Sequence, residues 1–127
     1  MSPQQSTINP EQMVAAIAEL ASDRKAIDIV ALDLRGMIGY ADYFVICTGR
    51  TDRQTHAIHD AIHQGMKSGH SLLPARVEGL GQGHWILLDY LDVVVHIFTP
   101  DTREYYRLEQ LWGEAPSLEV GVRVGAT

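Results

Sequence analysis

The sequence predicts an α/β domain in which helices pack on a mixed sheet of about five strands. Short runs of apolar, often branched residues, which are typical of strands, occur between segments whose apolar residues recur at helical spacing. These segments follow in the order helix, strand, strand, helix, strand, hairpin, helix, which implies a mixed sheet with helices packed on it. A length of 127 residues with 46% hydrophobic and 20% charged residues agrees with one globular domain.

The first part of the chain predicts one helix and two strands. Asn9 and Gln12 have the spacing of a capping box, and Pro10 suits the first helical turn. The apolar residues that follow fall on one helical face: Met13, Ile17, Leu20 and Ala21. Residues 28–34 and 42–48 are short apolar runs that predict strands.

A second helix is expected from Thr51 or Asp52, either of which can cap it, to about Ser68, with Gly69 ending it. Its apolar stripe is predicted to face the core: Ala57, Ile58, Ala61, Ile62 and Met66.

In the last part of the chain, a short extended segment is predicted at residues 75–77 and a glycine-rich loop at residues 78–83. Two strands are predicted at residues 84–89 and 92–98, and a helix at residues 99–112. Only Tyr90 and Leu91 separate the two strands, so a tight hairpin is expected. Neither residue favours the positive φ that such turns usually require.

Charge and composition exclude several classes of function. The 16 acidic and 10 basic residues give a net charge of −6 and a pI near 5.4, which disfavours binding to a nucleic-acid backbone. The N-terminal residues lack the charge and apolar run of a signal peptide, and no apolar run reaches the length of a membrane span. The single cysteine, Cys47, excludes an internal disulfide and fits a reducing compartment. We therefore expect a cytoplasmic protein that binds neither a membrane nor a specific nucleic-acid sequence.

Histidines at helical spacing raise the hypothesis of a metal site. His56, His59 and His63 fall within one sector of the second predicted helix, and the segment from His59 to His63 differs from the H-E-x-x-H zinc signature by having Asp60 in place of glutamate. However, an aspartate is too short to place its carboxylate as the catalytic base, and the pattern supplies no third ligand. We expect a solvated helix face and no metal site, with a metal-dependent hydrolase as the alternative.

Paired carboxylates raise a second hypothesis, nucleotidyl transfer. Asp42 opens a predicted strand, and Asp89 and Asp92 flank the predicted hairpin. This chemistry requires two acids that alternate on one strand and bind the same magnesium ion, whereas Asp89 and Asp92 span a turn. Capping and turn roles explain these acids more simply, and Cys47 is interpreted as a small hydrophobic residue inside a strand. No catalytic residue and no cofactor are expected, with a nucleotidyltransferase kept as the alternative.

Trp85 is the candidate residue for protein recognition. Strand alternation places Trp85, Leu87 and Asp89 on one face of a strand and Ile86 and Leu88 on the other. A large aromatic side chain near acidic residues is typical of an interface anchor. The pattern is equally compatible with Trp85 as a core residue.

Several separated motifs, in order and with similar spacing, resemble the ribosomal silencing factor family, also called Iojap. The motifs are the run at residues 41–49, Arg53-Gln54, Glu78-Gly79, the strands at residues 85–89 and 92–98, and the run at residues 103–112. The likeness covers about residues 10–113, which leaves residues 1–9 as an N-terminal extension and residues 114–127 as a C-terminal tail. The resemblance implies a nucleotidyltransferase-like fold without the catalytic acids.

The resemblance also implies a function. Family members bind the large ribosomal subunit through ribosomal protein fourteen, block its joining with the small subunit, and repress translation when nutrients are scarce. By similarity, the partner-binding residues are Glu78, Trp85, Leu88, Asp89 and Tyr90, together with Arg76 and Arg103. A homodimer of the free form through the same face is a further expectation. One departure is Leu91, which stands in a turn where the family commonly has glycine.

Overall fold

A computed structural model describes residues 8–37, 41–111 and 116–118 of the chain. Its helices and strands follow in the order α1 (Pro10–Asp23), β1 (Ile27–Asp33), β2 (Tyr43–Thr48), α2 (Asp52–His70), β3 (Arg76–Glu78), β4 (Trp85–Asp89), β5 (Val93–Phe98), α3 (Pro100–Tyr106), α4 (Leu108–Leu111) and β6 (Ser117–Leu118). All five predicted strands are present, so the expected α/β class is confirmed. Trp112, where the last helix was predicted to end, lies outside the described residues.

The strands form one mixed sheet in the order β3-β4-β5-β2-β1-β6. β2 and β5 lie side by side in its centre and run parallel, with Tyr43 opposite Val93 and Thr48 opposite Phe98. The other neighbouring strands are antiparallel. Every residue of β2 and β5 is buried, which explains why these two strands are nearly continuous apolar runs without alternation.

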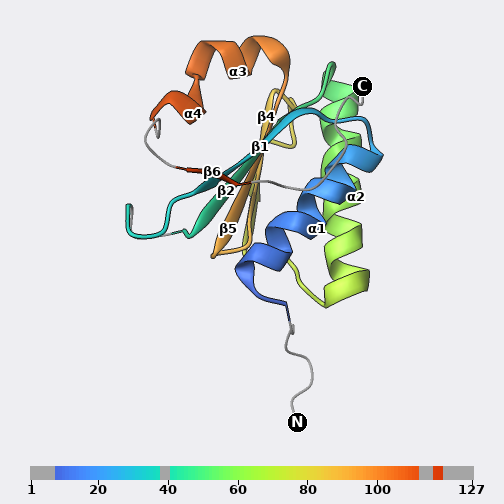
Figure 1. Cartoon of the computed structure of the whole chain (residues 1–127). Coiled ribbons are helices and arrows are strands. Elements are labelled where there is room, and N and C mark those ends of the chain that lie inside the picture. The colour runs from blue at the N-terminus through green and yellow to red at the C-terminus, as the bar shows by residue number, and fades with distance from the viewer. Residues whose placement is uncertain (1–7, 38–40, 112–115, 119–127) are drawn as a thin grey trace.

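Helices cover the two faces of the sheet unequally, as Figure 1 shows. α1 and α2 pack side by side along one face, whereas α3 and α4 lie over one end of the other face. The core beneath α1 and α2 contains residues of both helices and alternate residues of the strands, among them Ile17, Ile58, Ile62, Met66, Val45, Ile86, Leu88 and Val95. A second, smaller core on the opposite face contains Leu32, Phe44, Ile46, Val94, Phe98 and Leu108.

Local hydrogen bonds start both long helices where the sequence predicts. The Asn9 side chain accepts a hydrogen bond from the Gln12 N–H at 2.8 Å, and the Gln12 side chain accepts one from the Asn9 N–H at 2.9 Å. This is the predicted capping box. At the start of α2, Thr51 Oγ1 accepts a hydrogen bond from the Gln54 N–H at 3.1 Å.

Three segments differ from the prediction. α2 continues through Gly69 to His70, because Ser71 and not the glycine takes the left-handed conformation that ends the helix, with φ 57°. The last predicted helix is divided into α3 and α4 at Arg107, which also has a positive φ, 47°. Ser117 and Leu118 fall in the predicted tail, yet they pair with β1 at the edge of the sheet.

The predicted tight hairpin between β4 and β5 is confirmed. The Tyr90 N–H donates to the Val93 carbonyl at 2.9 Å, so Leu91 and Asp92 form the tip of the hairpin. Leu91 adopts a φ of 75°, a conformation that bulky residues rarely take. Leu91, at a position where the family commonly has glycine, therefore leaves the turn intact but strains its backbone.

Candidate protein-docking surface

One face of β3 and β4 carries Arg76, Glu78, Trp85 and Asp89. It is the face that α1 and α2 leave uncovered. In the register of these strands, Arg76 lies opposite Asp89. Alternate residues such as Leu88 point instead into the core beneath α1 and α2. The structure thus brings together four of the residues that the resemblance assigns to partner binding.

Leu88 and Tyr90 do not lie on this surface. Leu88 is fully buried and Tyr90 is 6% exposed, and both pack in the core beneath α1 and α2. Burial raises the pKa of Tyr90 to about 12. Because residues two apart on a strand share a face, Leu88 and Tyr90 point away from Trp85 and Asp89. Their predicted place on the surface is therefore corrected. In the free chain they are core residues that pack between the sheet and the helices α1 and α2.

The polar residues of the surface form a charged group made of Arg76, Glu78 and Asp89. The Arg76 guanidinium lies 2.9 Å from Glu78 Oε2 and 3.4 Å from Asp89 Oδ2. The side chains of Arg76 and Glu78 are more than half exposed, whereas Asp89 is mostly covered. Exposed ion pairs of this kind add little to stability. The charged group can therefore exchange its internal contacts for those of a partner at small cost.

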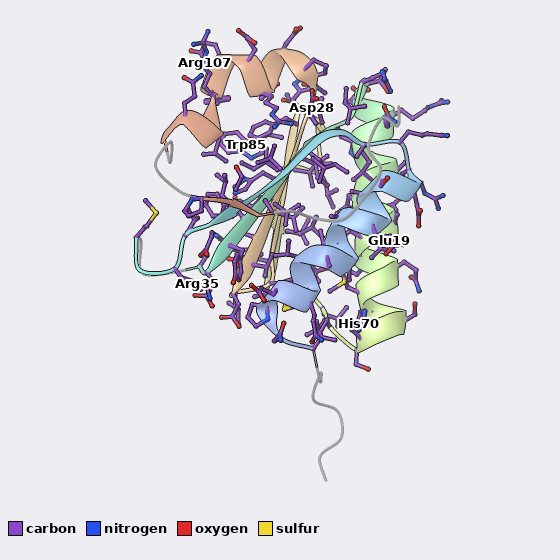
Figure 2. The ribbon with its side chains drawn as sticks, viewed as in Figure 1. Glu19, Asp28, Arg35, His70, Trp85 and Arg107 are labelled. Carbon is purple, nitrogen blue, oxygen red and sulfur yellow. The ribbon has the colours of Figure 1, made fainter. Side chains whose placement is uncertain are left out.

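Trp85 belongs to an aromatic group that also contains Tyr105 and Tyr106. The Trp85 ring centroid lies 4.8 Å from that of Tyr106, which in turn lies 4.9 Å from that of Tyr105. Tyr105 is 78% exposed and Tyr106 is 50% exposed, whereas Trp85 is half-buried between the sheet and α3 (Figure 2). Sequence reasoning missed both tyrosines, although they lie within a recognised motif. Trp85 therefore packs against the core with one side of its ring and contributes to the surface with the other.

A buried histidine holds Trp85 in place. The indole Nε1–H of Trp85 donates to His96 Nδ1 at 3.1 Å, so this nitrogen carries no proton. Burial lowers the pKa of His96 to about 4, although the nearby Asp89 carboxylate acts in the opposite direction. His96 is consequently neutral near pH 7 and acts as an acceptor beneath the docking surface.

Arg103 connects α3 to the sheet. Its Nη1 donates to the Asp28 carbonyl at 2.8 Å and to Thr48 Oγ1 at 2.8 Å. With Arg107, it lines a pocket of about 690 Å³ between β1 and the α3–α4 segment, and Arg107 is paired there with Glu104 at 3.3 Å. The contacts of Arg103 indicate a role in positioning α3, and with it the aromatic group, over the sheet.

His56 attaches the glycine-rich loop to α2. Its Nε2 lies 2.6 Å from the Leu80 carbonyl oxygen, and its Nδ1 lies 2.6 Å from the Asp52 carbonyl oxygen. Carbonyl oxygens only accept, so both contacts are hydrogen bonds only in the protonated form of the ring, which they therefore favour. These two contacts raise the pKa of His56. Because the loop leads directly into β4, His56 helps to fix the approach to Trp85.

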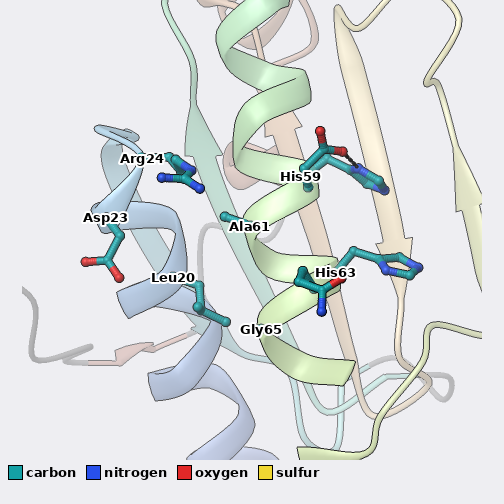
Figure 3. A pocket seen from close by; sticks show the side chains of 9 residues that line it. Leu20, Asp23, Arg24, His59, Ala61, His63 and Gly65 are labelled. Atoms are coloured by element: carbon teal, nitrogen blue, oxygen red, sulfur yellow. Dashed lines mark hydrogen bonds and ion pairs between the residues drawn. The ribbon is translucent and has the colours of Figure 1, made fainter. Parts of the chain in front are cut away.

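The histidine stripe on α2 is not the uniformly solvated face that the sequence predicts. His59 is buried, and its Nδ1 donates to Asp60 Oδ1 at 2.9 Å, while His56 is bonded to a loop. Figure 3 shows that the rings of His59 and His63 project from α2 on the side away from α1. Within residues 8–37, 41–111 and 116–118, no three metal-ligating side chains gather into a site.

The chain is similar over most of its length to proteins of one family. A family model described as "Ribosomal silencing factor during starvation" matches residues 7–125. The chain belongs to the ribosomal silencing factor family. The motifs at residues 41–49, 85–89 and 92–98, which suggested this family, correspond to β2, β4 and β5 and the turns beside them.

Individual relatives agree with this assignment. The ribosomal silencing factor of Bacillus subtilis is 40% identical over 109 residues, which are 86% of this chain and 92% of that protein. A crystal structure of a Chromobacterium violaceum protein superimposes with a TM-score of 0.81 at 28% identity, over 93% of this chain and 97% of that chain. A mouse protein named mitochondrial assembly of ribosomal large subunit protein 1 is 32% identical over 101 residues, but this chain spans only 43% of its length.

Membership in the ribosomal silencing factor family confirms the identity that the motifs predicted. The family model and the Bacillus subtilis relative are named for silencing, which is a regulatory role and not a reaction. The relation of the fold to nucleotidyltransferases stays a prediction. In the part of the chain that the structure describes, no helix combines the length and apolar character needed to cross a membrane.

Proposed function

We propose that this chain represses translation by binding the large ribosomal subunit through ribosomal protein fourteen and blocking its joining with the small subunit. Membership in the ribosomal silencing factor family supports a ribosomal role, and the family description refers to starvation. The name of the mouse relative refers to assembly of the large subunit. Such a repressor acts in the compartment of the free subunits, which for a bacterial chain is the cytoplasm.

The observation that carries the proposal is the aromatic group next to the charged group on one sheet face. Trp85 contacts Tyr106, and the two tyrosines beside it are at least half exposed. Arg76 and Asp89 lie along the same pair of strands. Exposed aromatic residues bordered by polar ones have the composition of energetically dominant residues in protein interfaces. The surface therefore suits a protein partner.

Net charge favours a basic protein over ribosomal RNA as the direct partner. The chain has a net charge of −6, which opposes contact with a phosphate backbone. Glu78 and Asp89 border the proposed surface and attract basic side chains. We infer that a ribosomal protein supplies most contacts and that binding weakens as salt concentration rises.

We further propose that the chain catalyses no reaction and requires no cofactor. Asp89 Oδ1 accepts a hydrogen bond from the Leu91 N–H at 2.8 Å, and Oδ2 faces Arg76. This carboxylate thus serves a turn and an ion pair, and Asp92 lies beyond the end of the strand at the hairpin tip. The alternative, a nucleotidyltransferase, predicts transfer from labelled nucleotides in the presence of magnesium, and we expect none.

Co-sedimentation with purified large ribosomal subunits tests the docking surface. We expect the wild-type chain to bind and to reduce the formation of joined ribosomes in a purified translation system. Glu78→Lys reverses an exposed charge of the surface and should weaken binding several-fold. Glu19→Lys makes the same change on the exposed side of α1, behind the sheet, and should bind as the wild type does (Figure 2).

A stronger variant combines Trp85→Ala with Asp89→Lys. Loss of an aromatic anchor and a charge reversal should weaken binding at least tenfold, with the circular dichroism spectrum still that of a folded chain. Cross-linking should identify ribosomal protein fourteen as the contact. A wild-type chain that neither binds large subunits nor hinders joining would refute the proposal. If free chains form a homodimer through this surface, as we also propose, large subunits should dissociate it.

A further inference from the structure

Leu91 adopts a strained conformation at the tip of the β4–β5 hairpin. Its φ is 75°, and the Asp92 N–H donates across it to the Tyr90 carbonyl at 3.0 Å. A three-residue turn with a positive central φ is a rare and strained form. A residue with a branched side chain takes it only when the surroundings enforce it.

The fold itself gains little from the Leu91 side chain. Leu91 is 63% exposed, so its burial contributes little to the core. A glycine would form the same turn without strain. The strain is sustained by neighbouring contacts, since Asp89 Oδ1 accepts a hydrogen bond from the Leu91 N–H at 2.8 Å. Residues that are held in strained and exposed conformations often serve function instead of stability.

Aspartates lie next to this apolar tip in the chain and in the sheet. Asp89 contacts the Leu91 backbone, Asp92 follows it in the chain, and the Asp42 N–H donates to the Asp92 carbonyl at 2.8 Å. An exposed apolar side chain inside an acidic border matches an apolar socket that basic residues surround. The chemistry of the tip therefore suits a basic protein surface.

The tip is continuous with the proposed docking surface. Asp89 joins the two, because its Oδ1 bonds to Leu91 while its Oδ2 faces Arg76 of the charged group. Trp85 and Leu91 are six positions apart along an extended strand, which separates them by roughly 20 Å. An interface of standard size buries about 800 Å² on each partner, a patch wide enough to include both ends of β4.

We propose that Leu91 is a second anchor of the docking surface and that it inserts into an apolar socket, bordered by basic side chains, on the large-subunit protein that the aromatic group contacts. This inference rests on the proposed function and adds a specific contact to it. Trp85 holds one end of β4 against the partner, and Leu91 holds the other end.

Three substitutions at Leu91 test the proposal, with affinity for purified large ribosomal subunits and the midpoint of urea unfolding measured for each. Leu91→Asn tolerates the positive φ but removes the apolar contact, and Leu91→Gly removes both the contact and the strain. Both should raise Kd about tenfold, while the unfolding midpoint stays the same or rises. Leu91→Met keeps an apolar side chain and should keep the affinity close to that of the wild type.

Leu80→Asn is the matched control. Leu80 is also an exposed leucine, at 40%, but it lies in the loop that His56 bonds to α2, which precedes β4, whereas Leu91 follows β4. This variant should bind as the wild type does.

If Trp85→Ala weakens binding while Leu91→Asn and Leu91→Gly do not, the second anchor is refuted and the proposed function stands. If Leu91→Asn weakens binding only in proportion to a lower unfolding midpoint, the role of Leu91 is structural and the inference also fails. If the wild-type chain does not bind large subunits, the proposed function fails first.

Discussion

The indole Nε1–H of Trp85 donates to Nδ1 of His96 across neighbouring strands, at 3.1 Å. This one hydrogen bond connects the exposed docking surface to a histidine that is 4% exposed. The geometry requires the neutral tautomer with its proton on Nε2, because Nδ1 must supply a lone pair. The orientation of the main aromatic residue of the surface therefore depends on the protonation state of a buried group.

We expect acid to destabilise the chain through His96. Its pKa is about 4 in the folded chain against an ordinary value of 6.5, because burial disfavours the charged ring. Between these two values the unfolded chain binds the proton more strongly, so stability is complete above about pH 6.5 and is lost progressively as pH falls toward 4. A shift of this size corresponds to about 3 kcal/mol. Urea unfolding at a series of pH values measures it.

Two further measurements separate the contribution of His96 to the pH dependence of stability from the contributions of other titratable groups. His96→Leu should show a flatter dependence of unfolding free energy on pH over the same interval. The Trp85 Nε1–H resonance of the wild type should persist at pH 5 and change only near pH 4. An imidazole of His96 that titrates near pH 6.5 in the folded chain would contradict the expected burial effect.

His56 should have the opposite pH dependence. The Leu80 and Asp52 carbonyls raise its pKa, so its stabilising effect is complete below about pH 6.5 and is lost as pH rises through its folded-state pKa. We expect amide hydrogen exchange at Gly83, whose N–H donates to the Gly79 carbonyl, to accelerate as His56 loses its proton. His56→Gln should accelerate exchange at this amide at pH 6.

His63→Gln is the control for His56→Gln. It lies on the same helix but is not bonded to the glycine-rich loop in the described part of the structure. It should leave exchange at Gly83 unchanged. Equal effects of the two substitutions would show that His56 has no particular role in holding the loop.

Two glycines of the same loop should respond very differently to alanine. A Cβ at Gly79 would lie 1.9 Å from the Trp85 carbonyl oxygen, and the residue has a φ of 88°, whereas a Cβ at Gly81 would meet nothing within 4 Å. Gly79→Ala should lower the free energy of unfolding by at least about 2 kcal/mol, because both the clash and the backbone strain must be accommodated. Gly81→Ala should change it by less than about 0.5 kcal/mol. Urea denaturation of both variants compares them directly, and similar losses would show that the loop rearranges freely.

Arg103 should matter for stability more than for direct binding. Arg103→Gln removes hydrogen bonds from the guanidinium to the Asp28 carbonyl and to the buried Thr48 hydroxyl, and should cost about 2 kcal/mol. Arg107→Gln removes only an exposed pair with Glu104 and should cost less than about 0.5 kcal/mol. Co-sedimentation with large subunits at a temperature where both variants are folded should give near wild-type affinity, because the contact between Tyr106 and Trp85 still holds α3 over the sheet. Loss of affinity by Arg103→Gln without loss of stability would instead make Arg103 a contact residue.

Much of the framework could be predicted because its signals are local. The Asn9–Gln12 capping box forms within one turn of helix, and alternation along β4 correctly separates Trp85 from Leu88. The same alternation contradicts the assignment, made by similarity, of Leu88 and Tyr90 to the surface. The structure confirms the alternation, since both residues are buried. The end of α2 was misplaced, because the left-handed residue that ends it is Ser71 and not the expected glycine.

The sequence by itself determined the family, the order of the strands and helices along the chain, and the face on which Trp85 and Asp89 lie. These follow from motifs and from periodicities that the backbone imposes over a few residues. Only the tertiary structure decided that Tyr106 packs against Trp85, that Leu80 receives a hydrogen bond from His56, and that His96 is buried and neutral. Such contacts join residues about ten to twenty-five positions apart, and their protonation states and exposure depend on which surfaces exclude water once the sheet and helices have assembled.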